Sequence, residues 1–357
     1  MNIISKLKLF AAVITSLMML IGVNSFALKG NHKGVPSIGS MVMMSGLENP
    51  WDLAFTKDMK AMFFTEKSQG LSVNVGGKTH KLLGIKGNSG GYAATNDDLF
   101  TYGGQEGMLG VEVDNNFKKN RTIYVYSASS KYMGEGCKKD NYASCFGNIV
   151  MKMTVAKDFK SVSGRTDIVT DIQFKPFKSD QPFGGPGAHN GGRIRMDSDG
   201  YLWVGTGDRH MGPGPQDKNM IAGKVLRIDG DGNAHPGNKI DGDKRIYSYG
   251  HRNPQGMTRN PLTGDIWIHE HGPKGGDEIN IVKPGKNYGW PKITYGINYS
   301  GTIITDQTEA PNMEQPIYYW IPSIAPSGMS FSTSEICLLY TSPSPRDRTS
   351  SRMPSSA

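Results

Sequence analysis

Short apolar runs separated by glycine, asparagine and aspartate turns dominate the middle of this 357-residue chain. Few segments show helical periodicity, and the runs are rich in the β-branched and aromatic residues typical of strands. The clearest predicted strands are residues 121–127 (RTIYVYS), 147–155 (GNIVMKMTV), 200–205 (GYLWVG), 223–228 (GKVLRI) and 265–269 (DIWIH). The pattern therefore predicts an all-β protein.

Two turn-strand units resemble each other, DSDGYLWVGTGD at 197–208 and NPLTGDIWIHEHG at 260–272. Each places a polar turn before an aromatic-containing strand and polar residues after it, which is typical of propeller blades. In a propeller, polar residues that follow the inner strands converge on a central channel. The repeats are faint, so the pattern alone leaves a β-sandwich as an alternative.

The two ends differ from this pattern. Residues 1–27 combine Lys6 and Lys8, an apolar run of 15 residues and a small-residue cleavage site, which predicts a signal peptide and export to the periplasm or the medium. The alternative is a membrane anchor, but the run is short for a spanning helix and no other stretch could span a bilayer. Residues 337–357 are a Ser/Pro/Arg-rich tail without periodicity, which resembles translated adapter sequence; a natural disordered tail is the alternative. The predicted globular domain is therefore 28–336.

The composition excludes some classes of protein. A hydrophobic content of 37% supports a buried core, and 46 glycines with 20 prolines fit a turn-rich body. The formal charge is +8, but the lysines of the signal and the net +2 of the tail leave only +4, dispersed over the body. No basic stripe suggests nucleic-acid binding. Cys137 and Cys145 could form a disulfide or remain free thiols.

Four glycine-rich segments place ionisable groups where backbone can approach a ligand: GGQEGMLGVEVD (103–114), GAHNGGRIRMDSDGYLWVGTGD (187–208), YGHRNPQGM (249–257) and HEHGPKGGDEINIVKPGKNYGWP (269–291). Taken in this order, they resemble the soluble pyrroloquinoline quinone (PQQ)-dependent glucose and aldose sugar dehydrogenases. The resemblance runs from Leu47 to Phe331. It implies a six-bladed β-propeller with PQQ and calcium at the top of the channel, whose last blade is missing or incomplete here.

The resemblance also implies roles for single residues. His189 resembles the general base, and imidazole suits proton removal near neutral pH. Asp208 resembles the carboxylate that orients this base. Arg252 and Asn253 resemble the pair that contacts the cofactor, with the guanidinium as oxyanion donor. Gln105 resembles a sugar contact, since an amide both donates and accepts hydrogen bonds.

Further positions concern the metal and the cofactor. The family ligates an active-site Ca²⁺ with the carbonyls that correspond to Gly272 and Pro273, and Glu278 and Tyr288 resemble positions around a second Ca²⁺. Ser323 is assigned to the cofactor contacts on the same ground. His269 and His271 invite a zinc interpretation, which we reject because no third ligand is related to them by a motif.

The resulting hypothesis is an exported dehydrogenase that oxidises aldoses at C1 to lactones and passes electrons through PQQ to an external acceptor. Ala188 stands where glucose-selective members carry an acidic residue, so the preferred sugar stays open, as does the choice between monomer and homodimer. The alternatives are a calcium-dependent propeller lactonase and a non-catalytic propeller that binds a glycan or a protein.

Overall fold

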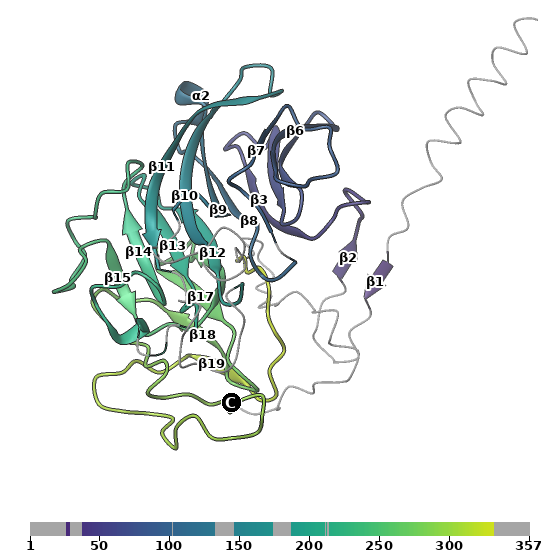
Figure 1. Ribbon diagram of the computed structural model, residues 1–357. Coiled ribbons are helices and arrows are strands. Elements are labelled where there is room, and N and C mark those ends of the chain that lie inside the picture. The colour runs from purple at the N-terminus through teal and green to yellow at the C-terminus, as the bar shows by residue number, and fades with distance from the viewer. Residues whose placement is uncertain are drawn as a thin grey trace, which may run out of the picture. The chain divides into compact units, whose positions relative to one another are not determined.

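The computed structural model describes residues 26–28, 38–101, 103–132, 146–173, 187–210, 212 and 214–331 (Figure 1). The chain divides into two compact units, residues 1–47 and 48–357. In the first unit, β1 (Phe26–Leu28) pairs antiparallel with β2 (Ile38–Ser40). The predicted signal peptide is described only at its last two positions, within β1, and the predicted tail and Cys137 and Cys145 lie outside the described residues.

The second unit contains four sheets, each built from strands that are consecutive in the chain. The first sheet has five strands and the other three have four. In chain order their strands are β3 (Pro50–Phe55), β4 (Ala61–Glu66), β5 (Gly70–Val75), β6 (Lys78–Ile85) and β7 (Ala94–Asn96); β8 (Met108–Val113), β9 (Thr122–Ser129), β10 (Gly147–Val155) and β11 (Val162–Ile172); β12 (Gly191–Met196), β13 (Leu202–Thr206), β14 (Lys224–Ile228) and β15 (Ile246–Tyr249); β16 (Pro254–Arg259), β17 (Ile266–Glu270), β18 (Asp277–Ile281) and β19 (Tyr318–Trp320).

Neighbouring strands pair antiparallel in every sheet, except that β6 and β7 are parallel. The described part of the chain has only a short helix, α2 (Phe117–Asn120), and a single 3₁₀ turn, η2 (Gly214–Gln216). No helix among the described residues is long and apolar enough to cross a membrane. The five strands predicted from the sequence correspond to β9, β10, β13, β14 and β17 within a few residues at each end. The all-β prediction is confirmed.

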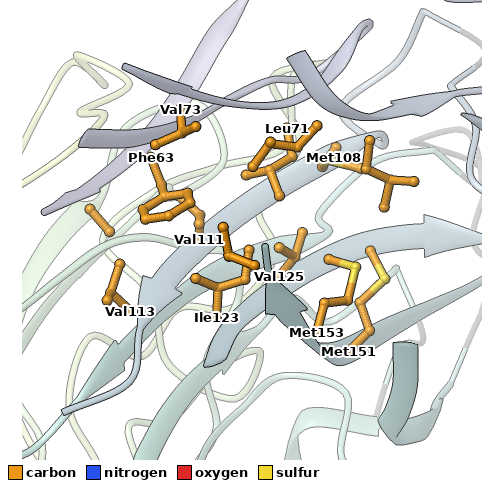
Figure 2. Packing of buried hydrophobic residues seen from close by; sticks show 14 of the residues in the cluster. Phe63, Leu71, Val73, Met108, Val111, Val113, Ile123, Val125, Met151 and Met153 are labelled. Atoms are coloured by element: carbon orange, nitrogen blue, oxygen red, sulfur yellow. The ribbon is translucent and has the colours of Figure 1, made fainter. Parts of the chain in front are cut away.

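Apolar residues are buried between consecutive sheets. Phe63 and Val73 of the first sheet pack against Val111, Ile123 and Met151 of the second (Figure 2). A second cluster lies between the second and third sheets, and a third cluster lies between the third and fourth. Each sheet after the first therefore has an apolar face toward its predecessor, and the sheets stack as propeller blades do.

Alternation along single strands explains this stacking. In β9, Ile123 and Val125 join the cluster shared with the first sheet, whereas Tyr124 and Tyr126 join the cluster shared with the third. Successive side chains of a strand point to opposite faces, so one strand contributes to two cores. A strand buried on both faces is apolar at consecutive positions, and β9 has this composition from Ile123 to Tyr126.

The first strand of each sheet lies against the first strand of the next: β3 contacts β8, β8 contacts β12, and β12 contacts β16. In Figure 1 the sheets of the second unit follow one another in chain order from purple to green. This is a propeller-like arrangement with four blades among the described residues. The count of six blades and the missing or incomplete last blade stay predictions.

Candidate active site

His189 and Asp208 lie on two loops at one end of the third sheet. His189 lies two residues before β12, and Asp208 lies two residues after β13. These strands pair antiparallel with Gly191 opposite Thr206, so the two loops are neighbours. His189 Nδ1 lies 2.7 Å from Asp208 Oδ1, and both side chains are buried. The structure thus brings together the predicted base and its orienting carboxylate.

The backbone around His189 is tightly constrained. His189 has a φ of 50°, in the left-handed region that non-glycine residues rarely occupy. A Cβ at Gly207 would overlap the carbonyl group of His189, so the chain needs a glycine there. Gly191, with a φ of 62°, completes the turn. The glycines of GAHNGG and GTGD therefore let the two loops approach closely enough for the side chains to meet.

Electrostatics favour a neutral imidazole beside an ionised carboxylate. Burial, followed by the nearby charge of Arg252, lowers the pKa of His189 to about 3. Burial alone would raise the pKa of Asp208, but His189, His210 and Arg252 outweigh it and hold that pKa below its usual range. At neutral pH the shared proton therefore resides on Nδ1, and Nε2 can accept a proton.

Arg252 lies next to this pair. Its backbone carbonyl accepts a hydrogen bond from the Asp208 amide at 2.7 Å. Its Nη1 donates to the carbonyls of His271 at 2.7 Å and Gly272 at 2.6 Å, and its Nε is buried without a hydrogen-bond partner among the described residues. A buried guanidinium with an unused donor is suited to an anionic ligand.

Gln105 and Asn253 hold the histidine loop from the two neighbouring sheets. Gln105 Oε1 accepts a hydrogen bond from the His189 amide at 2.7 Å, and Asn253 Oδ1 accepts one from Gly191 N at 3.0 Å. Gln105 also lines a cavity of about 310 Å³ whose walls include Trp51. This volume lies in the range of small-molecule sites. Five predicted residues, His189, Asp208, Arg252, Asn253 and Gln105, are therefore close together.

The metal candidates surround a separate small cavity. Gly272, Glu278 and Tyr288 line a space of about 10 Å³, together with Glu270. Burial and the charge of Glu270 raise the pKa of Glu278. The buried carboxyl group of Glu270 and the half-buried one of Glu278, with a nearby backbone carbonyl, form a donor set of hard oxygens that fits a Ca²⁺ ion. No cluster of three or more His, Cys, Asp or Glu side chains suited to a metal occurs in the described ranges, so carbonyl oxygens would have to complete the coordination.

Two predicted metal and cofactor residues are engaged elsewhere. The Tyr288 hydroxyl donates to Ile281 O at 2.6 Å, so Tyr288 could offer a metal only its backbone carbonyl. The Ser323 hydroxyl lies 2.7 Å from an oxygen of Asp277, and the Gly272 amide donates to the same carboxylate at 2.8 Å. Ser323 is thus connected to the site through Asp277. Pro273 follows Gly272 directly and does not line the small cavity.

Sequence reasoning passed over several residues of the site. Glu270 Oε2 accepts a hydrogen bond from Arg252 N at 2.5 Å, and its other oxygen lies 2.9 Å from His251 Nδ1. Trp290 Nε1 donates to Asp208 Oδ2 at 2.6 Å. Glu270 and Trp290 both belong to the segment 269–291, whose composition gave the only available signal. A pattern of residue types does not show that their partners lie in other segments.

Residues 47–340 match the family described as Glucose / Sorbosone dehydrogenase. The chain belongs to this family. Its relatives include aldose sugar dehydrogenase YliI of Escherichia coli (strain K12), which is 35% identical over 82% of this chain and 73% of the relative. Quinoprotein glucose dehydrogenase B of Acinetobacter calcoaceticus is 26% identical over 76% of this chain and 56% of the relative.

Membership of the glucose/sorbosone dehydrogenase family agrees with the fold. The crystal structure of the soluble aldose sugar dehydrogenase from Escherichia coli, in its apo form, superposes with a TM-score of 0.66 at 33% identity, covering 81% of this chain and 77% of that one. The resemblance stated from the sequence motifs is confirmed. The protein is an oxidoreductase of a family whose relatives include aldose sugar dehydrogenases.

Proposed function

We propose that this protein oxidises aldoses at the C1 hydroxyl to lactones, with PQQ as hydride acceptor and an external acceptor that reoxidises the cofactor. The observation that carries the proposal is the buried His189–Asp208 pair, 2.7 Å apart, beside the guanidinium of Arg252. Family membership and the quinoprotein among the relatives support the choice of a quinone. Binding a glycan or a protein without catalysis does not require a proton acceptor oriented beside a buried cation, so the arrangement favours an enzyme.

His189 supplies the proton acceptor. Asp208 fixes Nδ1 as the protonated ring nitrogen, which leaves the Nε2 lone pair to accept the proton of the C1 hydroxyl. Asp208 then stabilises the imidazolium that forms, because its carboxylate is ionised and buried 2.7 Å away. Burial makes His189 a weak base in the resting state, and this charge compensation is what permits proton transfer.

Arg252 and Asn253 are proposed to hold the cofactor. PQQ, when bound, would supply the acceptor for the hydride of C1. Arg252 would stabilise negative charge on the acceptor, because its buried Nε has no other partner among the described residues. The Asn253 side chain also accepts a hydrogen bond from Gly191 N and donates one to Gln105 Oε1, so it would hold the loop of the base beside the cofactor. Ser323 remains a proposed cofactor contact, and its hydroxyl is held by the hydrogen bond to Asp277.

Calcium is proposed at the carbonyls of Gly272 and Pro273 and at a second position near Glu278 and Tyr288. The neighbouring carboxyl groups of Glu270 and Glu278 make the local potential negative when ionised, which a divalent cation would compensate. Such an ion would fix the turn whose Gly272 carbonyl now accepts a hydrogen bond from Arg252.

The test compares the wild-type chain with His189→Gln, each loaded with PQQ and calcium. The wild type should reduce an artificial dye when given an aldose, whereas the variant should bind PQQ with an unchanged absorbance spectrum and turn over at least about 100-fold more slowly. His235→Gln is the matched control, since His235 is distant in sequence and hydrogen-bonds its own turn at Gly237. Absence of sugar-dependent reduction by the PQQ-loaded wild type rejects the proposal, and lactone hydrolysis without PQQ would favour the lactonase.

A further inference from the structure

Trp290 contacts both Asp208 and Arg252. Its indole Nε1 donates to Asp208 Oδ2 at 2.6 Å, and the Arg252 guanidinium carbon lies 5.2 Å from the centre of its rings. The backbone on either side of the ring is also fixed, because Trp290 N donates to Gly250 O at 2.9 Å and its carbonyl accepts from Gln216 Nε2 at 2.8 Å. The indole is therefore held in place by contacts that do not involve the site itself.

The indole hydrogen bond determines how the Asp208 carboxylate is oriented. Oδ1 accepts hydrogen bonds from His189 Nδ1 at 2.7 Å and from the His210 amide at 2.8 Å, while Oδ2 accepts one from Trp290 Nε1. Without the indole donor, Oδ2 would lie buried without a hydrogen-bond donor among the described residues, and the carboxylate could rotate to find one. Rotation would move Oδ1 away from His189, so the donor on Oδ2 keeps the imidazole in place.

The indole ring serves Arg252 in a different way. Arg252 Nη1 already donates to His271 O and Gly272 O. Contact with the face of an aromatic ring supports a guanidinium without consuming one of its N–H groups. Trp290 can therefore restrict Arg252 while leaving its remaining donors free for a ligand.

We propose that Trp290 is a positioning residue that couples the orientation of the His189–Asp208 pair to the placement of the Arg252 guanidinium. The inference rests on the proposed function, because it assigns to Trp290 the task of holding a proton acceptor and an oxyanion donor in one geometry. Trp290 itself touches neither substrate nor cofactor in this role.

Other charged groups also act on the His189–Asp208 pair. His210 and Arg252 act on both His189 and Asp208, and Arg209 and Lys224 act on Asp208. Trp290→Phe keeps an aromatic ring beside Arg252, so a change in the titration of His189 reports on the lost indole donor together with any shift of the Arg252 guanidinium.

The test is Trp290→Phe in the full chain, which keeps an aromatic ring and removes the N–H donor. With PQQ and calcium bound, kcat should fall about tenfold while KM for the sugar stays within about twofold. An Asp208 carboxylate without its indole donor can rotate away from His189 and stabilises the imidazolium less, so the pKa of His189 falls and the acid limb of the rate profile should move to lower pH. In the cofactor-free protein, ¹⁵N spectra of the His189 ring should show a weakened preference for the Nδ1–H tautomer.

Trp203→Phe is the matched control. Trp203 Nε1 donates to Asp197 Oδ2 at 3.0 Å, and the Arg227 guanidinium lies 4.9 Å from its rings, so the same two contacts occur at a place outside the site. This variant should lower thermal stability without moving the acid limb or the His189 tautomer. A role for Trp290 in folding alone would make the two variants behave alike.

The outcomes separate the inference from the function on which it rests. If the wild type oxidises aldoses but Trp290→Phe changes neither the acid limb nor the His189 spectrum, the inference is wrong and the function stands. If the His189 spectrum changes but no PQQ-loaded protein oxidises a sugar, the positioning contact stands and the function fails.

A second measurement covers the case in which Trp290→Phe does not fold. Asp208→Asn should shift the indole N–H resonance of Trp290 and leave that of Trp203 in place, whereas Asp197→Asn should do the reverse. An unmoved Trp290 resonance in Asp208→Asn would overturn the inference.

Discussion

Asp52 joins three of the four sheets, and its substitution by asparagine should destabilise the whole unit. Asp52 lies on β3, and its carboxylate accepts two hydrogen bonds of 3.0 Å from Arg195 of β12. It also forms an ion pair with Arg193 and accepts a hydrogen bond from Val111 N of β8 at 3.2 Å. The first three blades therefore share one buried charge.

The size of the effect follows from burial. Breaking a buried ion pair by removing one partner costs about 3–5 kcal/mol, because the other charge remains without compensation. The Arg195 side chain is 23% exposed and can gain water, whereas that of Arg193 is 3% exposed and cannot. Only one uncompensated charge remains, so we expect a loss of about 3 kcal/mol in the free energy of unfolding. At about 2 °C per kcal/mol for a domain of this size, the melting temperature falls by about 6 °C.

Urea unfolding followed by circular dichroism measures this loss, with Asp241→Asn as the control. Asp241 pairs with Lys218 at 2.8 Å, but its side chain is 78% exposed, so its removal should cost at most about 0.5 kcal/mol. A loss below about 1 kcal/mol in Asp52→Asn, or one equal to the control, would refute the reasoning.

The difference in the free energy of unfolding between the wild type and Asp52→Asn should also depend on pH, which gives a second check. Burial opposes ionisation of Asp52, but Arg193 and Arg195 outweigh it and lower its pKa. A lowered carboxyl pKa contributes stability above the pKa of the unfolded chain and loses it as the pH falls through the folded-state value. The free energies of unfolding of the wild type and Asp52→Asn should therefore approach each other below about pH 4, and their difference should stay constant above it.

Two further predictions concern other carboxyl groups. Burial raises the pKa of Glu112 to about 7, so the cost of ionising it destabilises the fold as the pH rises from the unfolded-state pKa toward 7. Glu112→Gln should therefore raise the melting temperature at pH 8 and leave it unchanged at pH 4. Equal changes in melting temperature at both pH values would contradict this. Calcium at 100 times its Kd should raise the free energy of unfolding of the wild type by about 2.7 kcal/mol, and a chelator should reverse the gain. Glu278→Gln should lose this stabilisation by calcium. Full stabilisation of the variant would exclude Glu278 as a ligand.

The sequence predicted the strands well because each carries its own signal. Residues 147–155 were predicted as a strand and form β10 with the same bounds, since an apolar run between turn residues needs no information from elsewhere in the chain. The predicted site residues His189, Asp208 and Arg252 meet for a related reason, because each follows or precedes an inner strand at a glycine-rich loop.

Contacts between distant segments could not be predicted. Trp290 and Asp208 are 82 positions apart, and Asp52 and Arg195 are 143 apart. Alternation determines which face of a strand is buried, but not which loop of another sheet supplies the partner of a polar side chain. The number of blades is open for the same reason, because a single blade pattern is compatible with rings of different size.

The loop that carries His189 is held by the sheets on both sides of its own. Gln105, before β8, accepts a hydrogen bond from the His189 amide, and Asn253, before β16, accepts one from Gly191 N. The position of the imidazole therefore depends on the register of three consecutive blades. A substitution that shifts one blade against the next should then affect turnover as well as stability, even where it touches no ligand. Asp52 joins the first three blades and so shares two of these three with the histidine loop, which is why Asp52→Asn should lower turnover as well as stability.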